Sequence, residues 1–97
     1  MTPSLPAGRQ GAPEIREMYF VYVIQSDVDG RFYKGLTKDI ENRVKEHNSG
    51  KTKSTRPYKP WKLVYLEEYK TREEARKREL FLKSGEGREL LKHILDP

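Results

Sequence analysis

The sequence predicts a small α/β domain of the α+β type, in which a three-stranded antiparallel sheet is flanked by helices in the order β-β-α-β-α-α. Three observations support this class. Two extended apolar runs flank an Asp-Gly pair, and a third extended run follows residue 60. Helix-capping residues occur both before and after this third run, and each set precedes a segment that is predicted to be helical. The length of 97 residues suits one hydrophobic core and not two.

The first two strands are expected to form a β-hairpin. Residues 19–26 are β-branched and aromatic, and residues 31–35 form a second extended run after the Asp-Gly pair. An Asp-Gly pair suits a two-residue turn in which both central residues have positive φ. Such a turn would place Tyr33 opposite Ser26. Because side chains alternate along a strand, four of them would then share one face of the sheet: Tyr22, Ile24, Ser26 and Tyr33.

The first helix is predicted to begin after a capping segment, residues 37–39, and to run to about His47. It should end at residues 48–50, Asn-Ser-Gly, because glycine readily adopts the left-handed conformation that terminates helices. Residues 51–60 are then a basic, proline-bearing loop, and residues 61–69 read as the third strand.

The second helix is predicted from a capping box formed by Thr71 and Glu74, and it should continue to about Lys83. The segment 84–87, Ser-Gly-Glu-Gly, is expected to break it. A short last helix should follow, with an apolar stripe at helical spacing formed by Leu91, Ile94 and Leu95.

Composition limits the class of protein. Residues 1–17 are rich in proline and glycine with almost no apolar periodicity, so we expect a disordered leader followed by one domain, residues 18–97. The chain contains no cysteine, which excludes disulfide bonds and cysteine-ligated metal centres. No apolar run approaches the roughly 18 residues of a membrane helix, so we expect no membrane association and a cytoplasmic location.

The charge of the chain points to a class of partner. The formal net charge is +5 and the isoelectric point is near 9.5. An excess of positive charge favours a polyanionic partner, and nucleic acid is the leading candidate. The alternative is that the basic charge serves solubility alone.

Both of the longer predicted helices carry charge on the stripe that should pack. At 100° per residue, Arg43 and His47 fall on the apolar stripe of the first helix, and Glu79 falls on that of the second. A buried guanidinium needs a carboxylate or a bound anion. A buried carboxylate needs a cationic partner or a hard metal ion such as Mg²⁺. These charged residues can therefore form ordinary ion pairs or belong to a functional site, and the sequence alone leaves both interpretations open.

Two short motifs resemble those of a known family. Phe20-Val21-Tyr22 and Tyr33-Lys34-Gly35 resemble the paired GIY and YIG motifs of the GIY-YIG nucleases, although Phe20 replaces a glycine and Lys34 an isoleucine. The resemblance extends over residues 18 to about 90 and is closest to the small single-domain branch, which is similar to the N-terminal part of an excinuclease of nucleotide-excision repair. The other matching stretches are Arg43-x-x-x-His47-Asn48, Leu63-Val64-Tyr65, Glu74-Ala75, Glu79 and Lys83.

This resemblance implies a metal-dependent endonuclease that hydrolyses DNA phosphodiester bonds, with structure-selective cutting in DNA repair or recombination. The alternative is a nucleic-acid-binding module with little intrinsic cleavage, which depends on a protein partner for its substrate. DNA is the implied partner in both cases. We expect a monomer or a weak dimer.

The same resemblance implies roles for five residues. Glu79 would bind one Mg²⁺ or Mn²⁺ ion, and Arg43 would contact the scissile phosphate. Tyr22 would contact or deprotonate the attacking water, and Tyr33 would position the phosphate or that water. His47 stands where some relatives have a third tyrosine, and its ordinary pKa of about 6.5 makes it a second candidate for the general base. The choice between Tyr22 and His47 stays open.

Cationic residues and one aromatic residue are candidates for contact with DNA. Such a mixture grips backbone phosphates and allows a base or sugar to stack, whereas the alternative is a solvated loop. The candidates are Lys34 from the second motif and, from the loop, Lys51, Lys53, Arg56, Tyr58 and Lys59.

Overall fold

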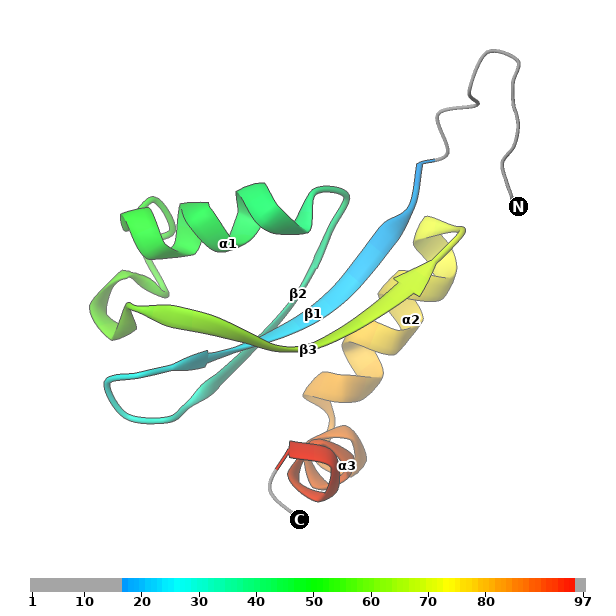
Figure 1. Ribbon diagram of the computed structural model, residues 1–97. Helices are drawn as coiled ribbons and strands as arrows, with labels where there is room; N and C mark the ends of the chain where they lie inside the picture. Colours follow the sequence, from blue (N-terminus) through cyan, green and yellow to red (C-terminus); the bar gives the residue numbers. More distant parts are fainter. Residues whose placement is uncertain (1–16, 96–97) are drawn as a thin grey trace, which may run out of the picture.

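The computed structural model describes residues 17–95 and has the predicted α+β architecture. A three-stranded antiparallel sheet in the order β2-β1-β3 has α1 on one face and α2 and α3 on the other (Figure 1). Within residues 17–95, no helix is both long and apolar enough to cross a membrane. The elements are β1 (Tyr19–Ser26), β2 (Phe32–Thr37), α1 (Ile40–Ser49), the 3-10 helix η1 (Arg56–Tyr58), β3 (Trp61–Tyr69), α2 (Arg72–Lys83) and α3 (Gly85–Leu95).

The hairpin of β1 and β2 has the predicted faces but not the predicted register. Tyr33 pairs with Ile24 and not with Ser26, because the connection is wider than a two-residue turn. The Ser26 amide donates to the Arg31 carbonyl at 2.9 Å, and the Gly30 amide donates to the Ser26 carbonyl at 3.0 Å. The Ser26 hydroxyl also accepts from the backbone amide of Val28 at 2.9 Å. The resulting shift is two residues, so every side chain keeps its predicted face.

Alternation along β1 divides the interior into two cores. Val21 and Val23 face α2 and α3, where they pack with the fully buried Ala75, Leu82 and Leu91. Tyr22 and Ile24 face α1 and pack with the buried Trp61, and four partly buried side chains complete this second core: Tyr33, Ile40, Val44 and Tyr58. The candidate catalytic tyrosines therefore lie between the sheet and α1.

The helix ends follow the capping signals in the sequence. The Asp39 carboxylate accepts from the Asn42 amide at 3.1 Å, and Gly50 ends α1 with a φ of 86°. Thr71 caps α2: its hydroxyl accepts from the Glu74 amide at 3.2 Å and donates to the Glu74 carboxylate at 3.1 Å. These caps fix where α1 and α2 begin, and hence which side chains face the sheet.

The last helix is longer than predicted. It begins at Gly85, inside the segment expected to break the chain, although the Ser84 position still ends α2. Gly87 is buried in the first turn of α3, where an added Cβ would overlap the carbonyl oxygen of Phe81. Gly87 thus permits close helix packing and does not end a helix. The predicted stripe is wrong at Ile94, which is 42% exposed, whereas Leu91 is buried.

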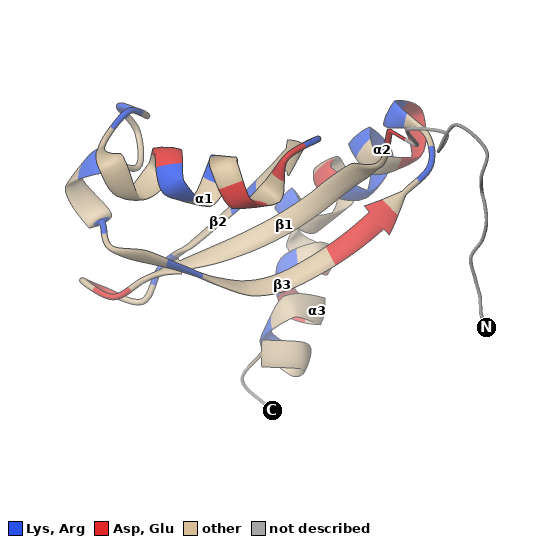
Figure 2. Ribbon diagram, turned by 45° about the horizontal axis from the view of Figure 1, so that its top comes forward, with Lys and Arg blue, Asp and Glu red and all other residues tan. Residues whose placement is uncertain are grey.

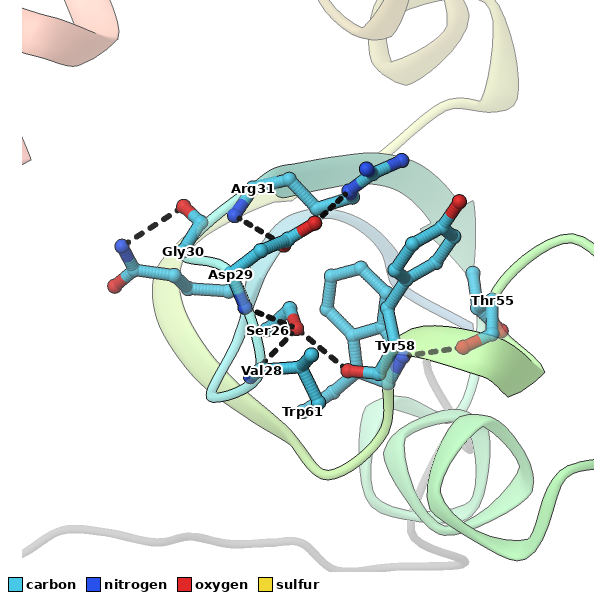
Figure 3. A network of polar contacts seen from close by, with 9 residues as sticks. Ser26, Val28, Asp29, Gly30, Arg31, Thr55, Tyr58 and Trp61 are labelled. Atoms are coloured by element: carbon cyan, nitrogen blue, oxygen red, sulfur yellow. Dashed lines mark hydrogen bonds and ion pairs between the residues drawn. The ribbon is translucent and has the colours of Figure 1, made fainter.

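A polar network ties the loop after α1 to the hairpin (Figure 3). The Ser26 hydroxyl donates to the Tyr58 carbonyl at 2.6 Å, and the Arg31 guanidinium lies 3.6 Å from the centre of the Tyr58 ring. The Trp61 indole donates to the Thr55 carbonyl at 2.9 Å. These contacts fix the position of the basic loop, and as a result Thr55 is buried beside α1.

Candidate active site

Three of the predicted site residues gather between the sheet and α1. The Tyr22 hydroxyl lies 3.0 Å from Nε2 of His47, in a hydrogen bond between buried groups. The Tyr33 ring packs edge-on against the imidazole of His47 with centroids 5.0 Å apart, and lies 6.5 Å from the Tyr22 ring. Tyr22 and His47 are 0% and 1% exposed, whereas Tyr33 is partly exposed. Tyr33 is therefore the member of this cluster that meets solvent.

The glycine of the second motif makes room for the first tyrosine. Gly35 pairs with Tyr22 across the two strands, and the Tyr22 ring lies over it. A Cβ atom at Gly35 would come within 2.8 Å of three atoms of the Tyr22 side chain. The lack of a side chain at Gly35 is thus a condition for the position of the Tyr22 hydroxyl.

Thr55 is a member of this cluster that the sequence did not reveal. Its buried hydroxyl lies 2.8 Å from Nδ1 of His47 and 3.3 Å from the Thr52 carbonyl, to which it donates. A hydroxyl has one proton, so the Thr55 oxygen is left to accept from Nδ1–H of His47. Nε2 then has no proton and accepts from the Tyr22 hydroxyl. We infer from this arrangement that Thr55 favours the His47 tautomer that can receive a proton from Tyr22.

Replacing Thr55 with valine is expected to remove this selection. The variant keeps the side-chain shape but leaves Nδ1–H buried without an acceptor, which costs about 1–3 kcal/mol of stability. Ring ¹⁵N chemical shifts of His47 should then no longer show the single Nδ1–H tautomer. Thr55→Ser is the matched control, because it retains the hydroxyl. An unchanged tautomer in Thr55→Val would contradict the assignment.

Burial changes the proton affinities of both bonded groups. Burial raises the pKa of Tyr22 to about 12, the neighbouring Tyr33 adds to the rise, and the Arg43 guanidinium opposes it. Burial also lowers the pKa of His47, and the positive charge of Arg43 lowers it further. At neutral pH the pair therefore rests as a neutral phenol and a neutral imidazole.

The depressed pKa of His47 predicts a pH dependence of stability. The unfolded chain binds a proton at His47 more readily than the folded protein, so the free energy of unfolding should fall as pH drops below about 6.5. Thermal denaturation at pH 7.5, 6.5 and 5.5 would measure this loss. His47→Asn should flatten the dependence in this interval, whereas His93→Asn, at an exposed position on α3, should not. An equal slope in wild type and His47→Asn would contradict this expectation.

Arg43 lies at the solvent-facing side of this cluster. Its side chain is 40% exposed, and its Nε atom is 3.1 Å from a carboxylate oxygen of Glu46, one turn along α1. Such an exposed ion pair contributes little to stability and exchanges easily for another anion. Arg43 lowers the pKa values of both Tyr22 and His47, so its charge acts within the cluster. It is the cation best placed to receive a phosphate there.

Glu79 comes from α2, which packs on the other face of the sheet. It is 6% exposed, and its two oxygens are bound by Arg76 at 2.9 Å and Lys83 at 3.0 Å. Its negative charge makes a small contribution to the raised pKa of Tyr22, so it acts on the cluster at a distance. The ordinary ion pairs considered from the sequence are therefore present at Glu79.

The donors at Glu79 suit only one kind of metal site. Among residues 17–95, no three His, Cys, Asp or Glu side chains lie close enough together to enclose an ion. A single carboxylate fits Mg²⁺, which keeps several waters and binds proteins through one or two carboxylates together with substrate phosphates. Arg76 and Lys83 have side chains that are 58% and 47% exposed, so both can return to solvent when a cation replaces them.

The predicted DNA contacts fall in two separate places. Four cations of the loop are exposed beside the C-terminal end of α1 (Figure 2): Lys51, Lys53, Arg56 and Lys59. Tyr58 lies among them, but Arg31 covers one face of its ring and Trp61 packs against it in a T-shaped contact, with centroids 6.5 Å apart. Lys34 points to the opposite face of the sheet, where burial lowers its pKa and the nearby charges of Arg88 and Lys83 lower it further.

These features define a class of protein. Residues 18–92 match the family model described as the GIY-YIG catalytic domain, and the chain belongs to this family of nucleases. The match spans every strand and the first two helices, and membership implies binding of DNA. Nucleases of this family generally use a divalent metal ion.

The similar proteins belong to a small branch of that family. A UPF0213 protein of Staphylococcus epidermidis (strain ATCC 12228) is 42% identical over 79 residues, which cover 80% of this chain and 95% of the relative. One from Staphylococcus aureus (strain Mu3) is 42% identical over 69 residues, covering 70% and 83%. The solution NMR structure of a UPF0213 protein from Bacillus halodurans is similar with a TM-score of 0.51 and 34% identity, covering 82% of this chain and 88% of the other.

Proposed function

We propose that this protein is a metal-dependent endonuclease that hydrolyses phosphodiester bonds of DNA. The observation that supports this function best is the buried hydrogen bond between Tyr22 and His47, with Tyr33 and Arg43 at its solvent-facing side. A hydrogen-bonded tyrosine and histidine beside a guanidinium add nothing to the apolar packing of a core. Phosphodiester hydrolysis needs a proton acceptor for the attacking water and a cation for the phosphoryl oxygens.

In this proposal Arg43 binds the scissile phosphate. Its planar fork of donors matches phosphate oxygens, and the Glu46 carboxylate that it now contacts is displaced by the substrate. Tyr33, the partly exposed tyrosine, positions the phosphate or the attacking water. The movement of the Arg43 side chain opens the path to the Tyr22 hydroxyl, which is otherwise closed to solvent.

Tyr22 and His47 act as one unit in proton transfer. A phenol with a pKa of about 12 is a poor base by itself at neutral pH. The Tyr22 oxygen takes the proton of the water while its own proton passes to Nε2 of His47, which lies 3.0 Å away. Thr55 holds His47 in the tautomer that this transfer requires. Tyr22 therefore stays neutral overall, and His47 gains the proton and a positive charge during the reaction.

Glu79 is the residue proposed to hold the divalent ion, Mg²⁺ or Mn²⁺. When bound, such an ion neutralises charge on the phosphate and lowers the pKa of nearby oxygen acids. Arg76 and Lys83 occupy the carboxylate in its absence and keep a buried charge compensated. The proposal includes a preference for particular DNA structures, such as those that arise in repair or recombination.

A binding module with little intrinsic cleavage is the second candidate. Two observations favour it: the Tyr22 hydroxyl is closed to solvent, and both oxygens of Glu79 are already engaged by cations. A partner protein that delivers the substrate would then be required for cutting. The cluster of Tyr22, His47 and Arg43 argues for the nuclease.

Cleavage by the purified protein and by Glu79→Gln tests these alternatives. Linear, flapped and four-way DNA are incubated with Mg²⁺, Mn²⁺ or EDTA, and Mn²⁺ binding is followed separately by electron paramagnetic resonance. We expect metal-dependent cutting by the wild type and a loss of both cutting and Mn²⁺ binding in Glu79→Gln. The control Glu73→Gln removes the same charge from an exposed position on α2 and should keep both. DNA binding without cutting on every substrate would favour the second candidate.

A further inference from the structure

A cleft lies at the N-terminal end of α1, on the side of the candidate active site away from the basic loop. It has a volume of about 370 Å³ and is formed where β2 leads into α1 and where α2 begins. The side chains around it come from three separate segments of the chain and are mostly polar. They are Tyr19, Leu36, Thr37, Lys38, Asp39, Asn42, Arg43 and Arg72, and we call this feature the α1–α2 cleft.

The α1–α2 cleft is suited to an anion. Three of its side chains are cations and one is a carboxylate, so the formal balance is positive. That carboxylate, Asp39, is engaged in capping α1 through the Asn42 amide and does not pair with the cations. Lys38 contacts Glu17 at 3.1 Å, but both side chains are more than half exposed. A pair of this kind is weak and gives way readily to a phosphate.

The cleft is continuous with the candidate active site through Arg43. This side chain lines the cleft and also acts on Tyr22 and His47, so a phosphate bound by Arg43 has the cleft directly beside it. The next phosphate of a DNA strand is one nucleotide away from the phosphate at Arg43. It therefore lies toward either the N-terminal or the C-terminal end of α1. Lys38 and Arg72 supply the cations on this side, and the basic loop supplies them at the other end of α1.

We propose that the α1–α2 cleft binds the phosphate next to the scissile one on the strand that is cut, with Lys38 and Arg72 as its contacts. The inference rests on the proposed function, because it takes Arg43 as the residue that binds the scissile phosphate. It assigns a binding role to two residues outside the family motifs, and it predicts that the strand runs lengthwise along α1.

The test measures DNA binding in EDTA, where no cutting occurs, by fluorescence anisotropy over a range of salt concentrations. The variant Lys38→Ala/Arg72→Ala should reduce the slope of log affinity against log salt by about 1, since both residues contact a single phosphate and each neutralised phosphate contributes about 0.9. At 0.15 M salt this corresponds to a loss of affinity of roughly 5-fold. Lys77→Ala/Lys92→Ala removes the same charge from exposed positions on α2 and α3 and should change neither quantity substantially.

A second measurement tests the position of the phosphate. Single linkages of the oligonucleotide are replaced in turn by uncharged methylphosphonate. At one position beside the linkage that is cut, the replacement should weaken binding by the wild type and not by Lys38→Ala/Arg72→Ala, because the partners of that phosphate are already gone. Equal effects on both proteins at every position would overturn the proposal, as would equal salt slopes for the variant and the control. If the wild type binds no DNA at all, the proposed function itself fails.

Discussion

Replacing Arg43 with alanine is expected to lower the rate of DNA cleavage by about a thousandfold, because Arg43 is the cation proposed to bind the scissile phosphate beside Tyr22 and His47. Stability should change by less than about 0.5 kcal/mol. The only ion pair that Arg43 makes among residues 17–95 is the exposed one with Glu46, and such helix pairs contribute little. Single-turnover cleavage and thermal denaturation would measure the two quantities.

Two further variants make the Arg43 experiment specific. Arg43→Lys keeps the charge but removes the planar fork, so it should recover only part of the lost rate. Lys45→Ala removes a cation from an exposed position on the same helix and should leave cleavage near the wild-type rate. If Lys45→Ala and Arg43→Ala lose the same activity, Arg43 contributes only general charge and its proposed role is wrong.

Replacing Gly35 with alanine is expected to destabilise the fold. The new Cβ would overlap the Tyr22 hydroxyl oxygen and lie 2.5 Å from the ring carbon that carries it. Tyr22 is fully buried, so its ring has no free space into which to move. Overpacking of this kind costs about 1–3 kcal/mol, and the melting temperature of a domain this size should fall by roughly 4–24 °C.

The Gly35 variant should also disturb the site. Any ring movement that relieves the overlap takes the Tyr22 hydroxyl away from His47 and breaks their hydrogen bond. Gly85→Ala is the matched control, because an added Cβ there meets nothing within 4 Å. It should be neutral or stabilise the protein by a few tenths of a kcal/mol. A melting temperature of Gly35→Ala equal to that of Gly85→Ala would show that the Tyr22 ring does not need this space.

Local rules predicted most of the fold. The capping residues Asp39 and Thr71 start α1 and α2 where the sequence indicated, because a cap depends on residues three or four positions apart. Side-chain alternation placed Tyr22 and Tyr33 on one face although the register was wrong by two residues, since an even shift preserves faces. The start of α3 was missed because the packing that Gly87 allows against Phe81 is a tertiary contact.

The candidate site was only partly predictable. Helical spacing showed that Arg43, His47 and Glu79 lie on packing stripes, but it could not show what each of them meets. Thr55 carries no signal in the sequence, because it is one of several small polar residues in a basic loop. The cation partners of Glu79 were one of two open possibilities. Arg76 and Lys83 lie three and four residues away on the same helix, so helical spacing makes these pairs possible, and the structure shows that both form.

The sequence by itself determined the family, the order of the elements and the faces on which the charged and phenolic side chains lie. These follow from motif spacing and from periodicities of 2 and 3.6 residues, which are properties of short segments. The tertiary structure alone decided that Tyr22, His47 and Thr55 form one hydrogen-bonded chain and that the α1–α2 cleft adjoins it. Contacts between residues far apart in sequence depend on how α1, α2 and the loop pack against the sheet, and no local pattern records that packing.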